Sequence, residues 1–218
     1  MNLKRIALAA AALAALGLAG PAAAQNSGWY VGGGIGEAHA DFETADFAGL
    51  TNVPFSGVDN SNTGGKAFGG YRLSPNVAVE FGLAALGRYK LRYGTAGGSN
   101  ASFNYDASAL TLGVVGILPL GGSGVSLMAR GGAALTLTKL SFASAQGPVY
   151  STRFCQTTYS DDCVSTKMNL TWGASAQFDV TPRWGLRFDY DDYGKAGDEF
   201  ETGRATLDMW SMNVLFRF

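Results

Sequence analysis

Hydrophobic and polar residues alternate with a period of two in eight stretches of the chain. In each stretch one set of alternate positions is free of charge, as Val79, Phe81 and Leu83 illustrate. Such alternation is typical of a β-strand with one apolar face, and a strand crosses a membrane with about 9–11 residues. The pattern therefore predicts strands at 28–38, 64–73, 77–89, 104–118, 124–139, 166–180, 184–193 and 205–218.

The other alternate positions of the same stretches collect polar and charged side chains. They include Lys66, Arg72, Glu80, Arg130, Gln177, Asp179, Arg187, Asp189 and Arg217. A soluble β-sandwich would turn these side chains to solvent, whereas a membrane barrel would turn them into its lumen. The alternation by itself leaves both folds open.

The connections between the predicted strands alternate between short and long. The turns at 74–76, 119–123 and 181–183 are short, and the polar or glycine-rich stretches 39–63, 90–103, 140–165 and 194–204 are long. Short turns at one end and long loops at the other are typical of an outer-membrane barrel. The chain is therefore predicted to be all-β. We expect an eight-stranded antiparallel up-and-down transmembrane β-barrel, with the long loops outside the cell and both termini in the periplasm.

Aromatic residues gather near the ends of the predicted strands. Tryptophan and tyrosine favour the membrane interface because the ring is apolar while its N–H or O–H stays in water. We therefore expect an interfacial girdle made of Trp29, Tyr30, Tyr71, Tyr89, Tyr93, Trp184, Tyr190, Tyr193 and Trp210.

The N-terminal segment has the features of a secretory signal peptide. A basic pair, Lys4 and Arg5, precedes an apolar stretch and a small-residue cleavage site at 22–24. The alternative is a membrane-anchor helix, but the apolar stretch is short for a span, which needs about 20 residues. We therefore expect residues 1–24 to be cleaved and residues 25–218 to form one barrel domain.

Composition narrows the classes of function. Charged residues make up 15% of the chain and hydrophobic ones 47%, which disfavours disorder. Without Lys4 and Arg5, 14 of the 16 basic residues remain against 17 acidic ones, which gives no support to nucleic-acid binding. A single histidine and two cysteines leave few side chains for catalysis or metal binding, so we expect no cofactor and no metal.

Four short motifs and the C-terminal segment add to this pattern. The motifs are Gly-Trp-Tyr-Val-Gly at 28–32, Ala-Phe-Gly-Gly-Tyr at 67–71, Val-Glu-Phe-Gly at 79–82 and Leu-Arg-Phe-Asp-Tyr at 186–190. The C-terminal segment places apolar residues at two-residue steps before a terminal phenylalanine: Trp210, Met212, Val214, Phe216 and Phe218.

The four motifs resemble the eight-stranded barrel of the OmpA-like family, and the C-terminal segment resembles the assembly signal of bacterial outer-membrane barrels. The resemblance implies the outer membrane of a Gram-negative bacterium, contact with its lipids and lipopolysaccharide, and insertion by the barrel assembly machinery. We expect no counterpart of the family's peptidoglycan-binding domain, and therefore no attachment to the cell wall.

Charged residues on the inward positions are the main candidates for a site. They are Glu80, Arg130, Arg187 and Asp189. An eight-stranded barrel is just wide enough for side chains to fill it, and an unpaired buried charge is costly, so we expect a paired polar core. OmpA-like barrels carry similar clusters, some of them proposed to gate a narrow path, but Val115 and Gln177 stand where better-known members carry a base and an acid. A structural core and a path for small ions or solutes both remain open.

The predicted long loops hold three further candidates. Cys155 and Cys163 fall in one loop, and a disulfide is the expected state in an oxidising compartment. An acidic hairpin is expected to be solvated, with divalent-ion bridging to lipopolysaccharide as the alternative. Its carboxylates are Asp189, Asp191, Asp192, Asp198, Glu199 and Glu201. His39 would be the base of an enzymatic barrel, but the adjoining sequence supplies no nucleophile.

The sequence therefore predicts a monomeric outer-membrane barrel with a structural and surface-exposed role. Its long loops would support membrane integrity, or would contact lipopolysaccharide, host surfaces or other surface ligands. A narrow channel for ions or small solutes is the first alternative. A lipid-modifying enzyme on a barrel is the second, and we expect no enzymatic activity.

Overall fold

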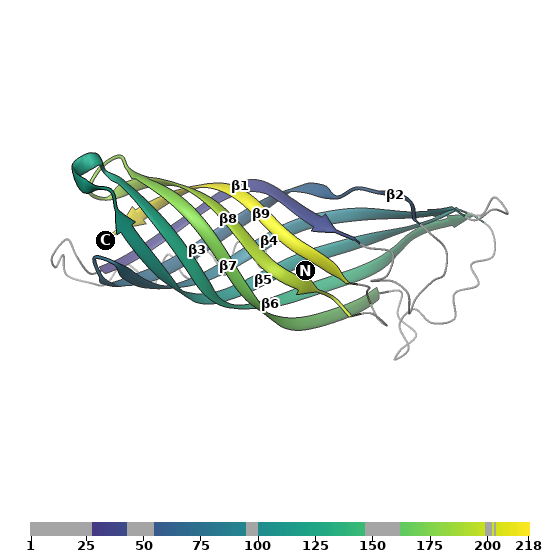
Figure 1. Cartoon of the computed structure of the whole chain (residues 1–218). Coiled ribbons are helices and arrows are strands. Elements are labelled where there is room, and N and C mark those ends of the chain that lie inside the picture. The colour runs from purple at the N-terminus through teal and green to yellow at the C-terminus, as the bar shows by residue number, and fades with distance from the viewer. Residues whose placement is uncertain (1–27, 43–54, 95–99, 147–161, 199–201, 203) are drawn as a thin grey trace.

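The computed structural model describes residues 28–42, 55–94, 100–146, 162–198, 202 and 204–218, and these residues form strands almost throughout (Figure 1). The strands are β1 (Gly28–Asp41), β2 (Phe55–Val58), β3 (Ser61–Ser74), β4 (Val77–Gly94), β5 (Asn100–Pro119), β6 (Val125–Gln146), β7 (Asp162–Asp179), β8 (Trp184–Ala196) and β9 (Ala205–Arg217). A short 3-10 turn, η2 (Gly121–Ser123), joins β5 to β6. Within these ranges no helix has the length and apolar character needed to cross a membrane.

Eight of the strands close into a barrel. Each pairs antiparallel with its neighbours in the order β4-β3-β1-β9-β8-β7-β6-β5, and pairing of β4 with β5 completes the circle. The first and last strands form one seam, which runs from Tyr30 opposite Arg217 to Asp41 opposite Thr206. The predicted eight-stranded antiparallel barrel is confirmed.

The register around the barrel fixes its stagger. Paired residues lead from one strand to the next through Ala176, Phe188, Met212, Ile35, Gly65, Ala85, Ser108, Leu137 and Thr166. The path leaves β7 at Ala176 and returns to it at Thr166, ten residues away. With a rise of about 3.3 Å per residue and about 4.8 Å between strands, this stagger tilts the strands by about 40° from the barrel axis.

The two faces of the strands are those that the alternation predicts. The outward side chains of Leu112 and Leu170 are exposed over 59% and 86% of their surface, as expected for residues that face lipid. The side chains of Glu80 and Arg187, on the opposite parity, are buried in the lumen. The hydrophobic surface of this protein therefore lies on the outside of the barrel.

A bulge in β4 reverses the two faces near its outer end. The pairing of β4 with β5 shifts between Ala85 and Gly87, and the φ of Gly87 is 94°, a conformation that favours glycine. Beyond the bulge Tyr89 is fully buried, whereas Arg88 and Lys90 are exposed on the outer face. If the regular alternation of β4 continued through these residues without a bulge, the two cations would point into the lumen.

The aromatic girdle is smaller than the sequence predicts. Its outward-facing members are Trp29, Tyr71, Trp184, Tyr190 and Trp210. The prediction is wrong for Tyr30, Tyr89 and Tyr193, which are buried in the lumen. Tyr30 and Tyr193 occupy inward positions on their strands, and the bulge turns Tyr89 inward. The side chain of Tyr93 lies outside the described part of the chain.

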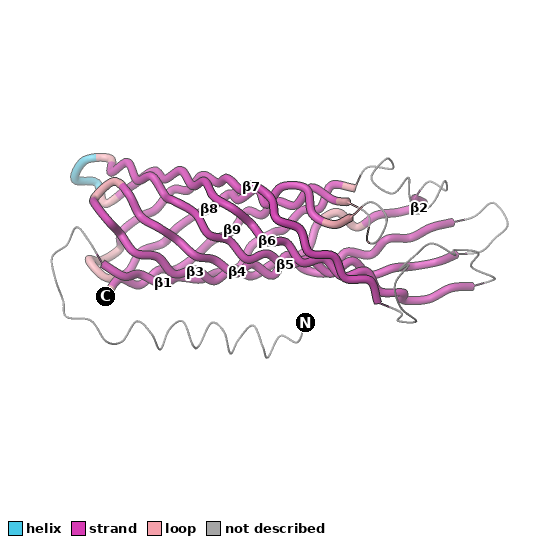
Figure 2. Tube along the Cα trace, turned by 90° about the horizontal axis from the view of Figure 1, so that it is seen from below, coloured by secondary structure: helices cyan, strands magenta, loops and turns pink. Residues whose placement is uncertain are grey.

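Three strands continue well past the others at the end opposite the short turns (Figure 2). β4, β5 and β6 have 18, 20 and 22 residues, more than the 9–11 or so that cross a membrane. β2, which lies in a stretch predicted to be a loop, pairs with β4 from Phe55 opposite Tyr93 to Val58 opposite Leu91. β2 and the outer parts of β4, β5 and β6 form what we call the extended sheet.

Candidate functional site in the barrel lumen

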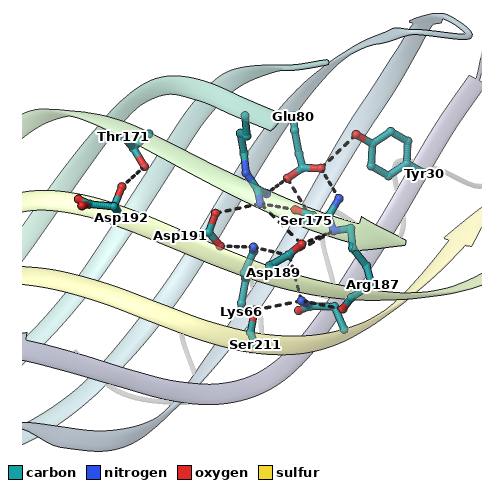
Figure 3. Close-up of polar contacts among 12 residues, drawn as sticks. Tyr30, Lys66, Glu80, Thr171, Ser175, Arg187, Asp189, Asp191, Asp192 and Ser211 are labelled. Atoms are coloured by element: carbon teal, nitrogen blue, oxygen red, sulfur yellow. Dashed lines mark hydrogen bonds and ion pairs between the residues drawn. The ribbon is translucent and has the colours of Figure 1, made fainter. Parts of the chain in front are cut away.

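The structure brings the four predicted lumenal charges together (Figure 3). Arg187 of β8 approaches Glu80 of β4 across the lumen, with 2.7 Å between Nη1 and Oε2. The Nε atom of Arg187 lies 3.0 Å from Oδ1 of Asp189. Arg130 of β6 reaches the same glutamate, with 2.5 Å between Nη1 and Oε1. Side chains from three strands thus converge on Glu80 and Asp189.

Two further members of this cluster, Lys66 and Asp191, were not among the predicted site residues, although the alternation places Lys66 on an inward position. The Nζ atom of Lys66 lies 2.7 Å from Oδ2 of Asp189, and Lys66 also forms an ion pair with Asp191. Asp191 in turn lies 2.9 Å from Nη2 of Arg130. Assigning Asp191 to a solvated hairpin is wrong, because β8 continues through it and its inward position buries it. Both residues occupy the inward alternate positions of their strands, and this position in the alternation was the feature of the sequence that could have identified them.

Opposite charges balance within this cluster, which we call the charged layer. It contains three cations, Lys66, Arg130 and Arg187, and three anions, Glu80, Asp189 and Asp191. Removing ions from water is costly, and close opposite charges with further hydrogen bonds offset that cost. Neutral side chains provide such bonds, because Tyr30 donates to Glu80 at 3.1 Å and Asn213 donates to Asp189 at 3.0 Å.

Little space remains inside the charged layer. The void lined by Lys66, Glu80 and Arg130 has a volume of about 10 Å³, enough for about one water molecule. The guanidinium of Arg187 lies 3.7 Å from the ring centroid of Phe68, so an aromatic face closes that side of the layer. Among the described residues the charged layer is therefore a packed cluster with space for about one water molecule.

An apolar layer closes the lumen on the side of the short turns. It consists of Tyr30, Phe68, Ala78, Val115, Ile117, Met128 and Leu215, all buried. Val115, which stands where relatives were expected to carry a base, is part of this apolar packing. The side-chain amide of Gln177 donates a hydrogen bond to Asp179 at 3.0 Å. Arg217 in turn forms an ion pair with Asp179 at 2.5 Å.

A second apolar layer closes the other side of the lumen. Its largest fully buried side chains are Leu86, Tyr89, Tyr105, Tyr193, Leu207 and Met209. The hydroxyl of Tyr89 donates to the carbonyl oxygen of Leu86 at 2.8 Å, which holds this ring across the lumen. Thr202, from the connection between β8 and β9, is fully buried and lies against Thr138 of β6. The charged layer is therefore enclosed between two apolar layers.

His39, the candidate base, lies on the outer wall of the barrel. Its Nδ1 atom is 3.5 Å from Oδ1 of Asp208, and its Nε2 atom is 3.5 Å from Oε1 of Glu37. Ser61 is opposite His39 in the register, but within the described part of the chain no hydrogen bond joins the two side chains. Within the ranges that the structure describes, the polar side-chain contacts of His39 are therefore carboxylates rather than a hydroxyl nucleophile. Among the described residues no group of three or more ligands could hold a metal ion.

The remaining predicted residues are the two cysteines and the C-terminal segment. Cys163 is buried near the start of β7, and Cys155 lies outside the described residues, so the disulfide stays a prediction. Trp210, Met212 and Val214 point outward along β9 and are exposed, as is the terminal Phe218, while Phe216 is partly buried. Their role as an assembly signal also stays a prediction.

Comparisons with known proteins agree with this architecture. OprG of Pseudomonas aeruginosa is 12% identical, with a TM-score of 0.58 over 88% of this chain and 97% of its own. Neisserial surface protein A is 15% identical, with a TM-score of 0.53 over 88% of this chain and 99% of its own. No curated protein matches in sequence. The family model described as "Outer membrane protein beta-barrel domain" matches residues 8–218, and the chain therefore belongs to that family.

Proposed function

We propose that this outer-membrane protein is a closed barrel that holds the extended sheet at the cell surface for contact with outside ligands. The observation that carries the proposal is the enclosure of the charged layer between two apolar layers. A channel needs a continuous wet path, and among the described residues packed side chains lie on both sides of the charged layer. The barrel therefore acts as an anchor.

The length of the outer strands supports a surface role. The ladder between β5 and β6 runs from Pro119 opposite Ser126 to Asn100 opposite Gln146. Its register shifts once, near Phe103. A paired sheet of this length holds residues beyond the bilayer in fixed positions, as rigid scaffolds do for binding loops. The extended sheet would thus present ligand contacts at a set distance from the membrane.

A narrow channel is the alternative outcome of the test. Opening it would require displacing both apolar layers as well as breaking the ion pairs of the charged layer. Enzymatic activity is not proposed, because His39 contacts carboxylates and is not joined to a hydroxyl nucleophile among the described residues.

Single-channel recording in planar lipid bilayers tests the proposal. We expect purified protein to show no stable conductance steps, and we expect Arg187→Ala to show none either, because the two apolar layers remain. Arg183→Ala, in the exposed turn before β8, is the matched control for loss of one arginine. Stable steps in the wild-type protein that increase in Arg187→Ala would establish the channel and overturn the closed barrel.

A further inference from the structure

A polar hollow lies on the outer wall of the barrel, away from the lumen. Its volume is about 350 Å³, within the range of sites for small ligands. It is lined by Asp59, Asn60, Ser61, Asn62, Arg88 and Lys90. These side chains come from the start of β3, the residues before it, and the part of β4 beyond the bulge. None of the six is apolar, which separates this hollow from the lipid-facing wall below it.

The hollow opens at the level of the lipid headgroups. The apolar outward series of β4, which includes Leu83 and Ala85, ends at the bulge, and Arg88 and Lys90 then occupy the outer face. Charged side chains on the lipid face are unfavourable within the hydrocarbon and tolerated near the interface. The edge of the hydrocarbon on β4 therefore lies near Gly87, and the hollow lies just beyond it.

Hydrogen bonds fix the walls of the hollow. The backbone N–H of Asp59 donates to the carbonyl oxygen of Lys90 at 3.2 Å, and that of Ala40 donates to Asn60 at 2.9 Å. The amide nitrogen of the Asn62 side chain donates to the carbonyl oxygen of Arg88. Because these bonds connect β1 and β4 with the residues at and before the start of β3, they hold the backbone around the hollow in place before any ligand arrives, which favours binding.

The cations of the hollow can accept an anionic ligand. The Nε atom of Arg88 lies 2.7 Å from Oδ1 of Asp106, and its terminal nitrogens have no partner in the described part of the chain. The ammonium of Lys90 likewise pairs with no carboxylate among the described residues. Charge-assisted bonds from arginine and lysine are the usual means of binding phosphate. The amide of Asn60, the hydroxyl of Ser61 and the carboxylate of Asp59 match the hydroxyls of a sugar.

We propose that the hollow binds a phosphorylated sugar in the headgroup of the outer-leaflet glycolipid, lipopolysaccharide. Arg88 and Lys90 hold the phosphate, and Asp59 and Asn60 bind hydroxyls of the sugar ring. The proposal rests on the proposed function, because it requires the extended sheet to lie outside the cell. Lipopolysaccharide, which surrounds the barrel in the outer leaflet, is then bound at one defined site on the outer wall of the barrel.

Binding of purified lipid A to the full-length protein in phosphatidylcholine nanodiscs tests the proposal. We expect Lys90→Gln and Arg88→Gln each to weaken lipid A binding about tenfold, the effect of losing one charge-assisted bond. Lys195→Gln is the matched control, because β8 lies diametrically opposite β4 in the strand order and Lys195 is also exposed. We expect this variant to bind like the wild type. Equal binding by Lys90→Gln and the wild type would overturn the site.

Further experiments distinguish lipid A from a free sugar phosphate as the ligand. They also distinguish failure of this site from failure of the proposed function. Lipid A without phosphates should bind about tenfold more weakly to the wild type, and equal binding would contradict phosphate recognition. Soluble glucosamine 1-phosphate should compete only at high concentration, since it lacks the acyl chains. Full competition at equal concentration would identify a free sugar phosphate as the ligand instead.

Labelling of Lys90→Cys on intact cells by an impermeant thiol reagent tests the orientation alone. Labelling without lipid A binding rejects the site and leaves the proposed function standing.

Discussion

Single residues of the charged layer show what could be foreseen from the sequence. Glu80, Arg187 and Asp189 lie on the inward parity of strongly alternating stretches, so their convergence in the lumen follows from a period of two. Lys66 has the same signature. Asp191 does not stand out, because a run of carboxylates reads as a solvated loop until its cationic partners on β3 and β6 are known. Pairings across the lumen depend on the stagger of the barrel, which the alternation does not fix.

Removing Arg187 should destabilise the barrel. The variant Arg187→Ala leaves Glu80 and Asp189 buried with one cation fewer, and breaking a buried pair in this way costs about 3–5 kcal/mol. Urea unfolding of the protein in lipid vesicles measures the loss. Arg183→Ala, on the exposed turn, should change the free energy of unfolding by less than about 0.5 kcal/mol. A loss for Arg187→Ala no larger than that of this control would contradict the structural role of the charged layer.

A glycine on β1 marks where the lumen has no room for a side chain. A Cβ at Gly34 would overlap the carbonyl oxygen of Met212 and approach the Cα of Asn213 to 2.7 Å, both in the backbone of β9. We expect Gly34→Ala to lower the free energy of unfolding by about 1–3 kcal/mol through overpacking. Gly131→Ala is the control, because nothing lies within 4 Å of its Cβ position. The same unfolding measurement compares the two, and equal values would mean that the seam can adjust.

At the scale of elements, the alternation of the sequence predicts the eight barrel strands but not where their outer ends lie. The predicted stretch 77–89 corresponds to β4, which runs to Gly94, and 124–139 corresponds to β6, which runs to Gln146. Past the bilayer the outward positions no longer need apolar residues, so the alternation fades while the hydrogen-bonded ladder continues. The four-residue β2 is too short for any period to be recognised, and its pairing with β4 is a tertiary contact.

The outward face of β5 gives a direct test of the lipid boundary. Leu112 is 59% exposed on the lipid face, and Leu112→Arg should cost about 2–4 kcal/mol near the bilayer midplane. Asn104, on the same face of the same strand, lies in the extended sheet, and Asn104→Arg should cost less than about 1 kcal/mol. Reversible unfolding in vesicles provides both values. If the two variants lost the same stability, the extended sheet would lie within the membrane.

At the scale of the whole molecule, the outer edge of the apolar band is oblique across β7, β8 and β9. On β8 and β9 the outward positions turn acidic at Asp192 and Asp208, two residues beyond Tyr190 and Trp210. On β7 the outward positions stay uncharged as far as Val164, eight residues beyond Trp172, and Met168 and Leu170 on the way are 71% and 86% exposed. A band that is higher on one wall fits a flat bilayer only if the barrel axis is tilted towards that wall.

Two positions, each four residues beyond an outward tryptophan on its own strand, test the tilt. Met168 and Thr206 both point outward, four residues beyond Trp172 and Trp210 respectively. We expect Met168→Arg to cost at least about 1 kcal/mol in vesicles, because it enters hydrocarbon, and Thr206→Arg to cost less than about 0.5 kcal/mol. Equal costs would indicate an upright barrel with an apolar surface that lipid does not cover.

The orientation across the membrane can be checked on intact cells. Asn60→Cys, beside the extended sheet, should react with an impermeant thiol reagent, because the long connections are expected outside the cell. Pro182→Cys, in a short turn, should react only after the outer membrane is opened. The reverse pattern would place the extended sheet in the periplasm and would invalidate the proposed surface role.

The seam between β1 and β9 makes the barrel dependent on β9, the last of its described strands in chain order. A chain that stops before Ala205 keeps the other strands but lacks the partner that β1 and β8 share. Both edges would then carry unpaired backbone groups, which lipid cannot satisfy. A prematurely terminated product therefore has no stable form within the bilayer, however well its remaining strands pair. Stable insertion therefore depends on β9 having joined both of its neighbours.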